Sequence, residues 1–196
     1  MSGRVYADVL RPSRRAAAAA YDLGLVLAGS VLLAACAQVK LFLPFTAIPI
    51  TAQTFAVLLL GVSLGRWRGV AAVTAYLAQG AAGLPVFAVG GGVGYLAGPT
   101  AGFLWGFVPA AWLAGALAEH GWDRRPLTAA GAMALADAAL FTPGVLWYAG
   151  FVGLDGAVST SVVPFLPGEA IKIALATALL PTAWRLIGDR PNDANA

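Results

Sequence analysis

The stretch DLGLVLAGSVLLAACAQVKLF, residues 22–42, has no charged residue between Asp22 and Lys40. An apolar run of about 20 residues is long enough to cross a lipid bilayer as an α-helix. Five more apolar stretches follow it, at residues 49–65, 69–88, 101–119, 127–151 and 167–187. Polar and apolar residues do not alternate with a period of two along them, which argues against the strands of a β-barrel. The sequence therefore predicts an all-α integral membrane protein with six transmembrane helices in one compact bundle.

The composition agrees with this fold and excludes several classes of function. Of the 196 residues, 60% are hydrophobic and 11% are charged, whereas about a quarter of the residues in a soluble domain are charged. The formal net charge of +3 comes from basic residues scattered through short connections, so we expect no nucleic-acid partner. Cys36 is the only cysteine, which leaves no disulfide framework and no cysteine-based metal site.

The arginines predict the orientation of the spans. All ten lie before the first span, between the second and third, between the fourth and fifth, or from the end of the sixth onward. The positive-inside rule makes this side cytoplasmic. We therefore expect a multi-pass protein of a bacterial cell membrane with both termini inside, divided into a cytoplasmic segment at 1–21, a membrane domain at 22–187 and a cytoplasmic tail at 188–196.

The tetrapeptide LAAC, residues 33–36, is similar to the cleavage box of a bacterial lipoprotein signal, and a basic segment precedes it. Lipidation of Cys36 is thus an alternative to a small residue packed in the first helix. We favour packing, because a lipoprotein signal normally delivers a soluble domain and the rest of this chain is equally apolar. Arg14 and Arg15 are interpreted as a cytoplasmic anchor rather than a twin-arginine signal.

Ionisable residues near the apolar core of a membrane are costly and therefore candidates for function; here they are Lys40, Asp137, Glu169 and Lys172. In PFLPGEAIKIALA, residues 164–176, Glu169 falls in the first turn of the sixth helix, where the helix dipole favours an anion. Lys172 follows three residues later on the same face. The pair offers an acceptor beside a donor, or it is an ion pair that satisfies itself. Asp137 is either a binding residue or, as we slightly favour, a packing residue bonded to a neighbouring helix.

The connection LFLPFTAIPITAQT, residues 41–54, contains Pro44 and Pro49. Two prolines so placed prevent a regular helix. The connection is apolar apart from a few polar residues, among them Thr46 and Thr51, and we interpret it as an outer lid folded over a cavity. A rigid interfacial turn is the alternative.

A second outer connection, GGGVGYLAGPT at residues 90–100, is rich in glycine. It lacks the Lys-Ser/Thr ending of a phosphate-binding loop and follows no predicted strand, so a phosphate cradle is rejected. Glycines such as Gly91 and Gly92 instead allow the backbone to move and to approach a ligand closely. We interpret this run as a second lid, with a flexible linker as the alternative.

The sequence offers no enzyme active site. The single histidine, His120, lies in a predicted cytoplasmic connection, away from Glu169 and Lys172. No serine–histidine pair or metal-ligand cluster is evident, so we expect neither catalysis nor a cofactor.

Four runs carry a family resemblance: LPFTAIPITAQTFAVLLLGVSLG (43–65), GLPVFAVGGG (83–92), GPTAGFLWGF (98–107) and PFLPGEAIK (164–172). In this order they resemble the biotin-specific S components of energy-coupling-factor (ECF) transporters, the BioY family, between about residues 37 and 180. The resemblance implies a six-helix, S-component-like bundle that captures biotin from outside with high affinity. It also implies a transmembrane coupling subunit and two cytoplasmic ATPases as partners.

The resemblance assigns roles to individual residues. The last motif of the family usually reads Pro-Gly-Asp-x-x-Lys, and Glu169 stands here in place of the aspartate. By resemblance, Glu169 accepts the ureido N–H groups of biotin and Lys172 donates to the ureido oxygen. Further ligand contacts are expected from residues near the outer face: Phe87, Trp147 and Tyr148 for an apolar wall, and Tyr95, Thr51 and Gln53 for the polar ends.

Two other functions stay open. A self-sufficient secondary biotin transporter driven by an ion gradient would use Asp137 as a proton carrier. A structural membrane protein would bind no ligand.

Overall fold

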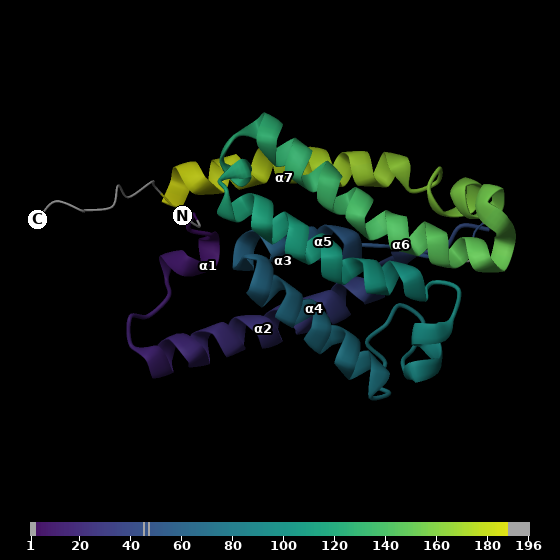
Figure 1. The fold of residues 1–196 in the computed structure, drawn as a ribbon, viewed down its shortest axis with the longest axis horizontal. Coiled ribbons are helices and arrows are strands. Elements are labelled where there is room, and N and C mark those ends of the chain that lie inside the picture. The colour runs from purple at the N-terminus through teal and green to yellow at the C-terminus, as the bar shows by residue number, and fades with distance from the viewer. Residues whose placement is uncertain (1–2, 45, 47, 188–196) are drawn as a thin grey trace, which may run out of the picture.

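The computed structural model describes residues 3–44, 46 and 48–187, which form a bundle of helices along the long axis of the molecule (Figure 1). Six helices coincide with the six predicted apolar stretches: α2 (Arg15–Gln38), α3 (Gln53–Leu64), α4 (Arg66–Ala81), α5 (Ala101–Glu119), α6 (Pro126–Ser161) and α7 (Leu166–Ile187). The shorter elements are α1 (Tyr6–Val9), η1 (Val93–Ala97), η2 (Trp122–Arg124) and the strands β1 (Lys40–Leu41) and β2 (Ile50–Thr51).

Among the described helices, α2, α5, α6 and α7 are long and apolar enough to cross a membrane. Helix α3 is apolar but has only 12 residues, and α4 has 16 residues and begins with the sequence RWR. The protein therefore has several apolar helices consistent with a multi-pass membrane protein. The predicted number of six transmembrane helices is not confirmed, because two of the six helices are short.

The helix ends differ from those expected. Helix α2 begins at Arg15, inside the segment predicted to precede the membrane, and α6 continues to Ser161 rather than ending at residue 151. Gly153 interrupts α6 with φ 77° and ψ 164°. Glycine adopts a positive φ without the steric cost that other residues meet, so Gly153 divides the long helix into two differently directed parts.

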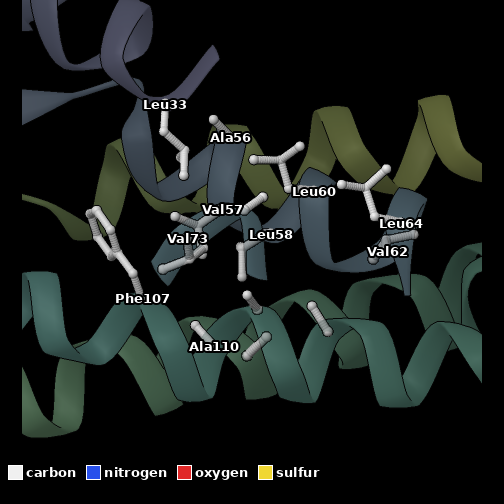
Figure 2. Packing of buried hydrophobic residues seen from close by; sticks show 14 of the residues in the cluster. Leu33, Ala56, Val57, Leu58, Leu60, Val62, Leu64, Val73, Phe107 and Ala110 are labelled. Carbon is white, nitrogen blue, oxygen red and sulfur yellow. The ribbon is translucent and has the colours of Figure 1, made fainter. Parts of the chain in front are cut away.

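Helix α5 packs against α3, α4 and α6 and so forms the centre of the bundle. Small residues bring its backbone close to its neighbours: a Cβ on Gly61 of α3 would lie 2.6 Å from the carbonyl oxygen of Ala111. Close approach through small residues is how helices associate in lipid. Figure 2 shows the apolar side chains at this contact, with Leu58 of α3 directed toward Ala110 of α5. The core thus lies between α3 and α5.

One end of the bundle, which we call the arginine end, holds α1 beside the last turns of α7 (Figure 1). Tyr6 of α1 stacks on Trp184 of α7 with ring centroids 4.5 Å apart, and its hydroxyl donates to the carbonyl oxygen of Leu180 at 2.6 Å. Arg68 pairs with Asp8 and Asp22 here. This grouping agrees with arginines on one side, although the orientation of that side stays a prediction. The predicted tail at 188–196 lies outside the described residues.

The opposite end, the cavity end, carries the two connections predicted as lids. Strands β1 and β2 pair antiparallel, with Lys40 opposite Thr51 and Leu41 opposite Ile50. The predicted irregular connection is therefore confirmed, but the fold is mostly helical rather than strictly all-α. The pairing was not evident in the sequence because two-residue strands leave no periodic pattern.

Candidate functional site

A cavity with about 530 Å³ of empty space, part of it open to solvent, lies at the cavity end. Its walls come from β2, α3, α5, α6 and the start of α7: Ile48, Pro49, Thr51, Gln53, Thr54, Ala88, Tyr95, Thr100, Phe103, Leu104, Phe107, Leu140, Phe141, Phe165 and Glu169. Small-molecule sites typically have mostly apolar walls and a few placed polar groups. The lining of this cavity, with many apolar side chains and the single charged group Glu169, fits such a site.

Glu169 is the charged group in this wall, and it is only 4% exposed. The Nζ atom of Lys172 lies 2.7 Å from its Oε1. The hydroxyl of Thr54 lies 3.0 Å from Oε1 and 3.2 Å from Oε2. A buried charge is tolerated when it is paired and hydrogen-bonded, and both partners hold the Glu169 carboxylate at the cavity wall.

Lys172 connects α7 with the β2–α3 junction. Its ammonium group donates to Glu169 Oε1 at 2.7 Å, to Thr54 Oγ1 at 2.7 Å and to the carbonyl oxygen of Thr51 at 3.1 Å. An ammonium has three N–H donors and no acceptor, so these contacts use all three. Because Thr54 accepts from Lys172, its own hydroxyl proton is free to donate to Glu169. The cluster is thus a closed network of one cation, one anion and one hydroxyl.

A second network joins the cavity to the glycine-rich connection. Gln53 donates to the hydroxyl of Tyr76 at 2.7 Å. The Tyr76 ring meets Phe87 edge-on at 5.4 Å, and Phe87 stacks on Tyr95 at 4.9 Å. The ring of Phe87 occupies the space that a side chain at Gly80 would need. Tyr95 of the glycine-rich connection is thus linked through Phe87 and Tyr76 to Gln53 of the cavity wall.

The glycine-rich connection is a compact turn followed by η1. Gly90 and Gly92 have φ of 129° and 97°, values that favour glycine. A Cβ on Gly91 would clash with the carbonyl oxygen of Leu84. At these positions glycine is thus required by the observed backbone.

Comparison with known proteins agrees with this architecture. The profile of the BioY family matches residues 11–189, nearly the whole described chain. The chain belongs to the BioY family.

Two relatives illustrate the similarity. "Biotin transporter BioY" from Rhodobacter capsulatus is 38% identical over 142 residues, which cover 65% of this chain and 74% of that protein. "Biotin transporter BioY" from Thermotoga maritima is 36% identical over 139 residues, which cover 70% and 81%. A crystal structure of the S-component for biotin from an ECF-type ABC transporter superimposes with a TM-score of 0.76 at 20% identity, over 85% of this chain and 92% of that one. The fold is therefore that of an S component.

The structure brings several of the predicted BioY site residues together. Thr51, Gln53, Tyr95 and Glu169 line the cavity, and Lys172 bonds to Glu169. Thr46 lies in the connection predicted to be the first lid, where its side chain accepts from the backbone N–H of Ile48 at 3.1 Å. The neighbouring residues 45 and 47 of that lid lie outside the described part. Lys40 donates to the carbonyl oxygen of Ala88 and so ties β1 to the second connection.

The three aromatic residues predicted as an apolar wall are absent from the cavity lining. Phe87 is wedged against Tyr76. Trp147 is 42% exposed and donates to the carbonyl oxygen of Gly98 at 2.9 Å. Tyr148 packs in a buried cluster with Ile48 and Phe165, two residues that line the cavity, but is not itself in the lining. Their role in binding stays a prediction, whereas the observed wall is built by other aromatic and apolar side chains: Phe103, Leu104, Phe107, Leu140, Phe141 and Phe165.

Sequence reasoning missed Thr54 and this set of phenylalanines. A signal existed for Phe103 and Phe107, which stand four residues apart in GFLWGF and so share one face of α5. Thr54 follows Thr51 by three residues, but only the approach of α7 to α3 reveals that its hydroxyl meets Lys172. Residues on different helices have no spacing that a single sequence exposes.

The remaining residues considered as candidates for catalysis or metal binding do not form a site. His120 lies at the arginine end, with its Nδ1 2.6 Å from the carbonyl oxygen of Ala116. Cys36 is a free, half-buried cysteine of α2. In the part of the chain that the structure describes, no group of three or more His, Cys, Asp or Glu side chains is arranged to hold a metal.

Proposed function

We propose that this chain is the biotin-capturing membrane subunit of a vitamin importer. It binds biotin from outside a bacterial cell membrane, in the cavity beside Glu169 and Lys172. The observation that carries the proposal is the buried Glu169 carboxylate in the wall of an otherwise mostly apolar cavity, paired with the ammonium group of Lys172. Membership of a family whose relatives are named biotin transporters supports it.

The chemistry of biotin suits this wall. Its ureido ring carries two N–H donors and a carbonyl acceptor that points the opposite way, so it needs both an acceptor and a donor from the protein. Glu169 supplies the acceptor. Lys172 supplies the donor by exchanging one of its three protein contacts for the ureido oxygen. The sulfur-containing ring and the aliphatic chain are apolar and fit against Phe103, Phe141 and Phe165, while Thr51, Gln53 and Tyr95 serve the polar ends.

The two outer connections act as lids in this proposal. The first carries Thr46 and Thr51, and the second carries Gly91 and Gly92. Ala88, just before the second connection, and Tyr95 within it line the cavity. Lys40, just before the first connection, donates to the carbonyl oxygen of Ala88. Closure of one lid would therefore be coupled to closure of the other.

The partners that we propose are a transmembrane coupling subunit and two cytoplasmic ATPases, which supply the energy for uptake. A self-sufficient secondary transporter is the second candidate. It is favoured by the position of Asp137, whose carboxyl lies within hydrogen-bonding range of Glu169, as a proton carrier would require.

Binding of labelled biotin to the purified protein tests the capture role. We expect saturable binding at one site, and weaker binding of 2-iminobiotin, in which the oxygen that Lys172 would contact is replaced by nitrogen. Absence of biotin binding by folded protein would overturn the proposal. A structural membrane protein would give that result.

Uptake into vesicles separates the two transport candidates. Biotin accumulation that needs ATP and coexpressed coupling and ATPase subunits supports the importer. Accumulation by this chain alone that collapses when an ionophore removes the proton gradient supports the secondary transporter instead.

A further inference from the structure

Asp137 is an acidic residue near the cavity that is not among the proposed biotin contacts. It lies on α6, three and four residues before the cavity-lining Leu140 and Phe141. Asp137 itself is absent from the lining, but its carboxyl lies within hydrogen-bonding range of the Glu169 carboxyl. Its Oδ1 atom is buried and has no hydrogen-bond partner in the described chain. Asp137 therefore acts on the site through Glu169.

The charges around these two carboxyls do not balance. Lys172 is the cation that faces them. Helix α3 contains no titratable residue, and the one titratable residue of α5, Glu119, pairs with Arg66 at the arginine end. On η2, Asp123 bonds to Trp184 and Arg124 lies over the same ring. Among the described residues, two carboxyl groups thus share one ammonium.

Two ionised carboxylates cannot form a hydrogen bond with each other, because both are acceptors only. When two of them share a poorly hydrated site, repulsion keeps one protonated, and the pair then titrates as a unit. A single proton between Asp137 and Glu169 supplies the missing donor. It also brings the net charge of the cluster with Lys172 to zero, which a low-dielectric surrounding favours.

We propose that Asp137 is a positioning residue for ligand capture, which shares one proton with Glu169 and donates it to the Glu169 carboxylate. This donor, with Lys172 and Thr54, fixes the orientation in which Glu169 accepts N–H groups of the ligand. The inference rests on the proposed function for its biotin readout. Loss of the shared proton at alkaline pH adds a negative charge beside Glu169 and removes the donor, so ligand affinity falls as pH rises.

The substitution Asp137→Asn tests this directly, because its amide donates like the protonated acid but does not ionise. In mildly acidic buffer we expect the variant to bind biotin within about threefold of the parent, since the donor is kept. From mildly acidic to alkaline buffer, the parent should lose about tenfold in affinity and Asp137→Asn should lose much less. The two proteins differ only at this carboxyl group, so the difference between their pH profiles isolates the shared proton.

Two further variants test the donor itself and control for the change of charge. Asp137→Leu keeps the size but removes the donor, and should weaken binding about tenfold even in mildly acidic buffer. Asp155→Asn makes the same change at an exposed position of the same helix and should follow the parent at every pH. Coincident pH profiles of Asp137→Asn and the parent would overturn the inference.

A measurement without biotin keeps the inference separate from the proposed function. The infrared spectrum of the unliganded parent should contain the C=O stretch of a buried protonated carboxylic acid at neutral pH. Asp137→Asn and Glu169→Gln should both lack this band, because each leaves a single carboxyl that pairs with Lys172. A parent spectrum without the band overturns the shared proton, whatever biotin does. Failure of the parent to bind biotin while the band is present overturns the proposed function alone.

Discussion

At the arginine end, charged residues meet near the surface and in balance: Arg11 with Asp22, Arg66 with Glu119, and Arg68 with Asp8 and Asp22. At the cavity end, one lysine serves two carboxyl groups beside empty space. Ion pairs that water can reach contribute about 0–1 kcal/mol each to stability, and every side chain of the first set is at least 14% exposed, so this set mainly fastens helix ends. In the second set, the Glu169 side chain is only 5% exposed, and ionisable groups buried in a membrane protein are costly and therefore functional candidates.

The comparison shows that an ion pair can fasten helices at one end of the molecule and form part of a candidate binding site at the other. Arg68 is surrounded by acids that complete its hydrogen bonds, so little is gained by adding a ligand. Glu169 is held at the wall of a cavity, where a ligand with N–H groups would add to the network. Burial and adjacent space therefore distinguish a candidate binding pair from a structural one.

The largest expected contrast between the two ends is in accessibility from outside the cell. In a Cys36→Ser background, Asp155→Cys should react with a membrane-impermeant thiol reagent added to sealed cells, and Trp67→Cys should not. Both residues are exposed on the protein surface, so only the membrane separates them. Labelling of Trp67→Cys before lysis would reverse the predicted orientation.

Breaking the pair at the cavity end should affect binding most. Lys172→Ala leaves Glu169 without its cation, and loss of one partner of a buried pair costs about 3–5 kcal/mol. This corresponds to a loss of roughly 200- to 5,000-fold in biotin affinity, measured by equilibrium binding on purified protein. Arg68→Ala breaks two ion pairs at the arginine end and serves as the control. Arg68→Ala should leave the biotin affinity unchanged. If folded Lys172→Ala binds biotin within tenfold of the parent, the Glu169–Lys172 pair has a structural role and not a binding role.

A smaller loss is expected from Thr54→Val, which keeps the shape of the side chain but removes the hydroxyl between Lys172 and Glu169. Hydrogen bonds to charged groups contribute about 1.5–3 kcal/mol, so biotin affinity should fall by roughly 10- to 100-fold. Thr142→Val removes an exposed hydroxyl that bonds only within α6 and is the matched control. Equal affinities of the two variants would remove Thr54 from the site.

The smallest effect is expected at the second lid and concerns rates. Gly92 has a positive φ, whereas Gly94 has none and has open space around its Cβ position. An alanine at Gly92 strains the observed turn by about 1–2 kcal/mol, so dissociation of labelled biotin should accelerate by roughly 5- to 30-fold. Gly94→Ala should release biotin at the parental rate. If the two variants behave alike, the second connection is a passive linker.

The comparison also separates what could be predicted from what could not. The positions of the six helices and the pair Glu169–Lys172 were predictable, because apolar length and a spacing of three residues are local properties. The S-component fold followed from the resemblance and is supported by the structural match. The number of membrane crossings stays a prediction, because α3 has 12 residues and α4 has 16, fewer than the roughly 20 that a span needs.

The aromatic wall was the weakest part of the prediction. Phe87, Trp147 and Tyr148 were chosen from motifs, but none of them is in the cavity lining. Phe87 contacts Tyr76, Trp147 donates to Gly98, and Tyr148 packs with the cavity-lining Ile48. Aromatic residues near a membrane interface have several competing uses. Composition near a motif therefore does not say which rings face a cavity.

By itself, the sequence determined that this chain is a mostly helical membrane protein with its arginines grouped between alternate spans, and that Glu169 and Lys172 share a helix face. These properties depend on residues close together in the chain, whose geometry is set by the helix repeat. Only the tertiary structure decided that Thr54 of α3 and Asp137 of α6 meet Glu169. Those contacts join residues far apart in the sequence, and they arise from the packing of α7 against α3 and α6, which no local pattern encodes.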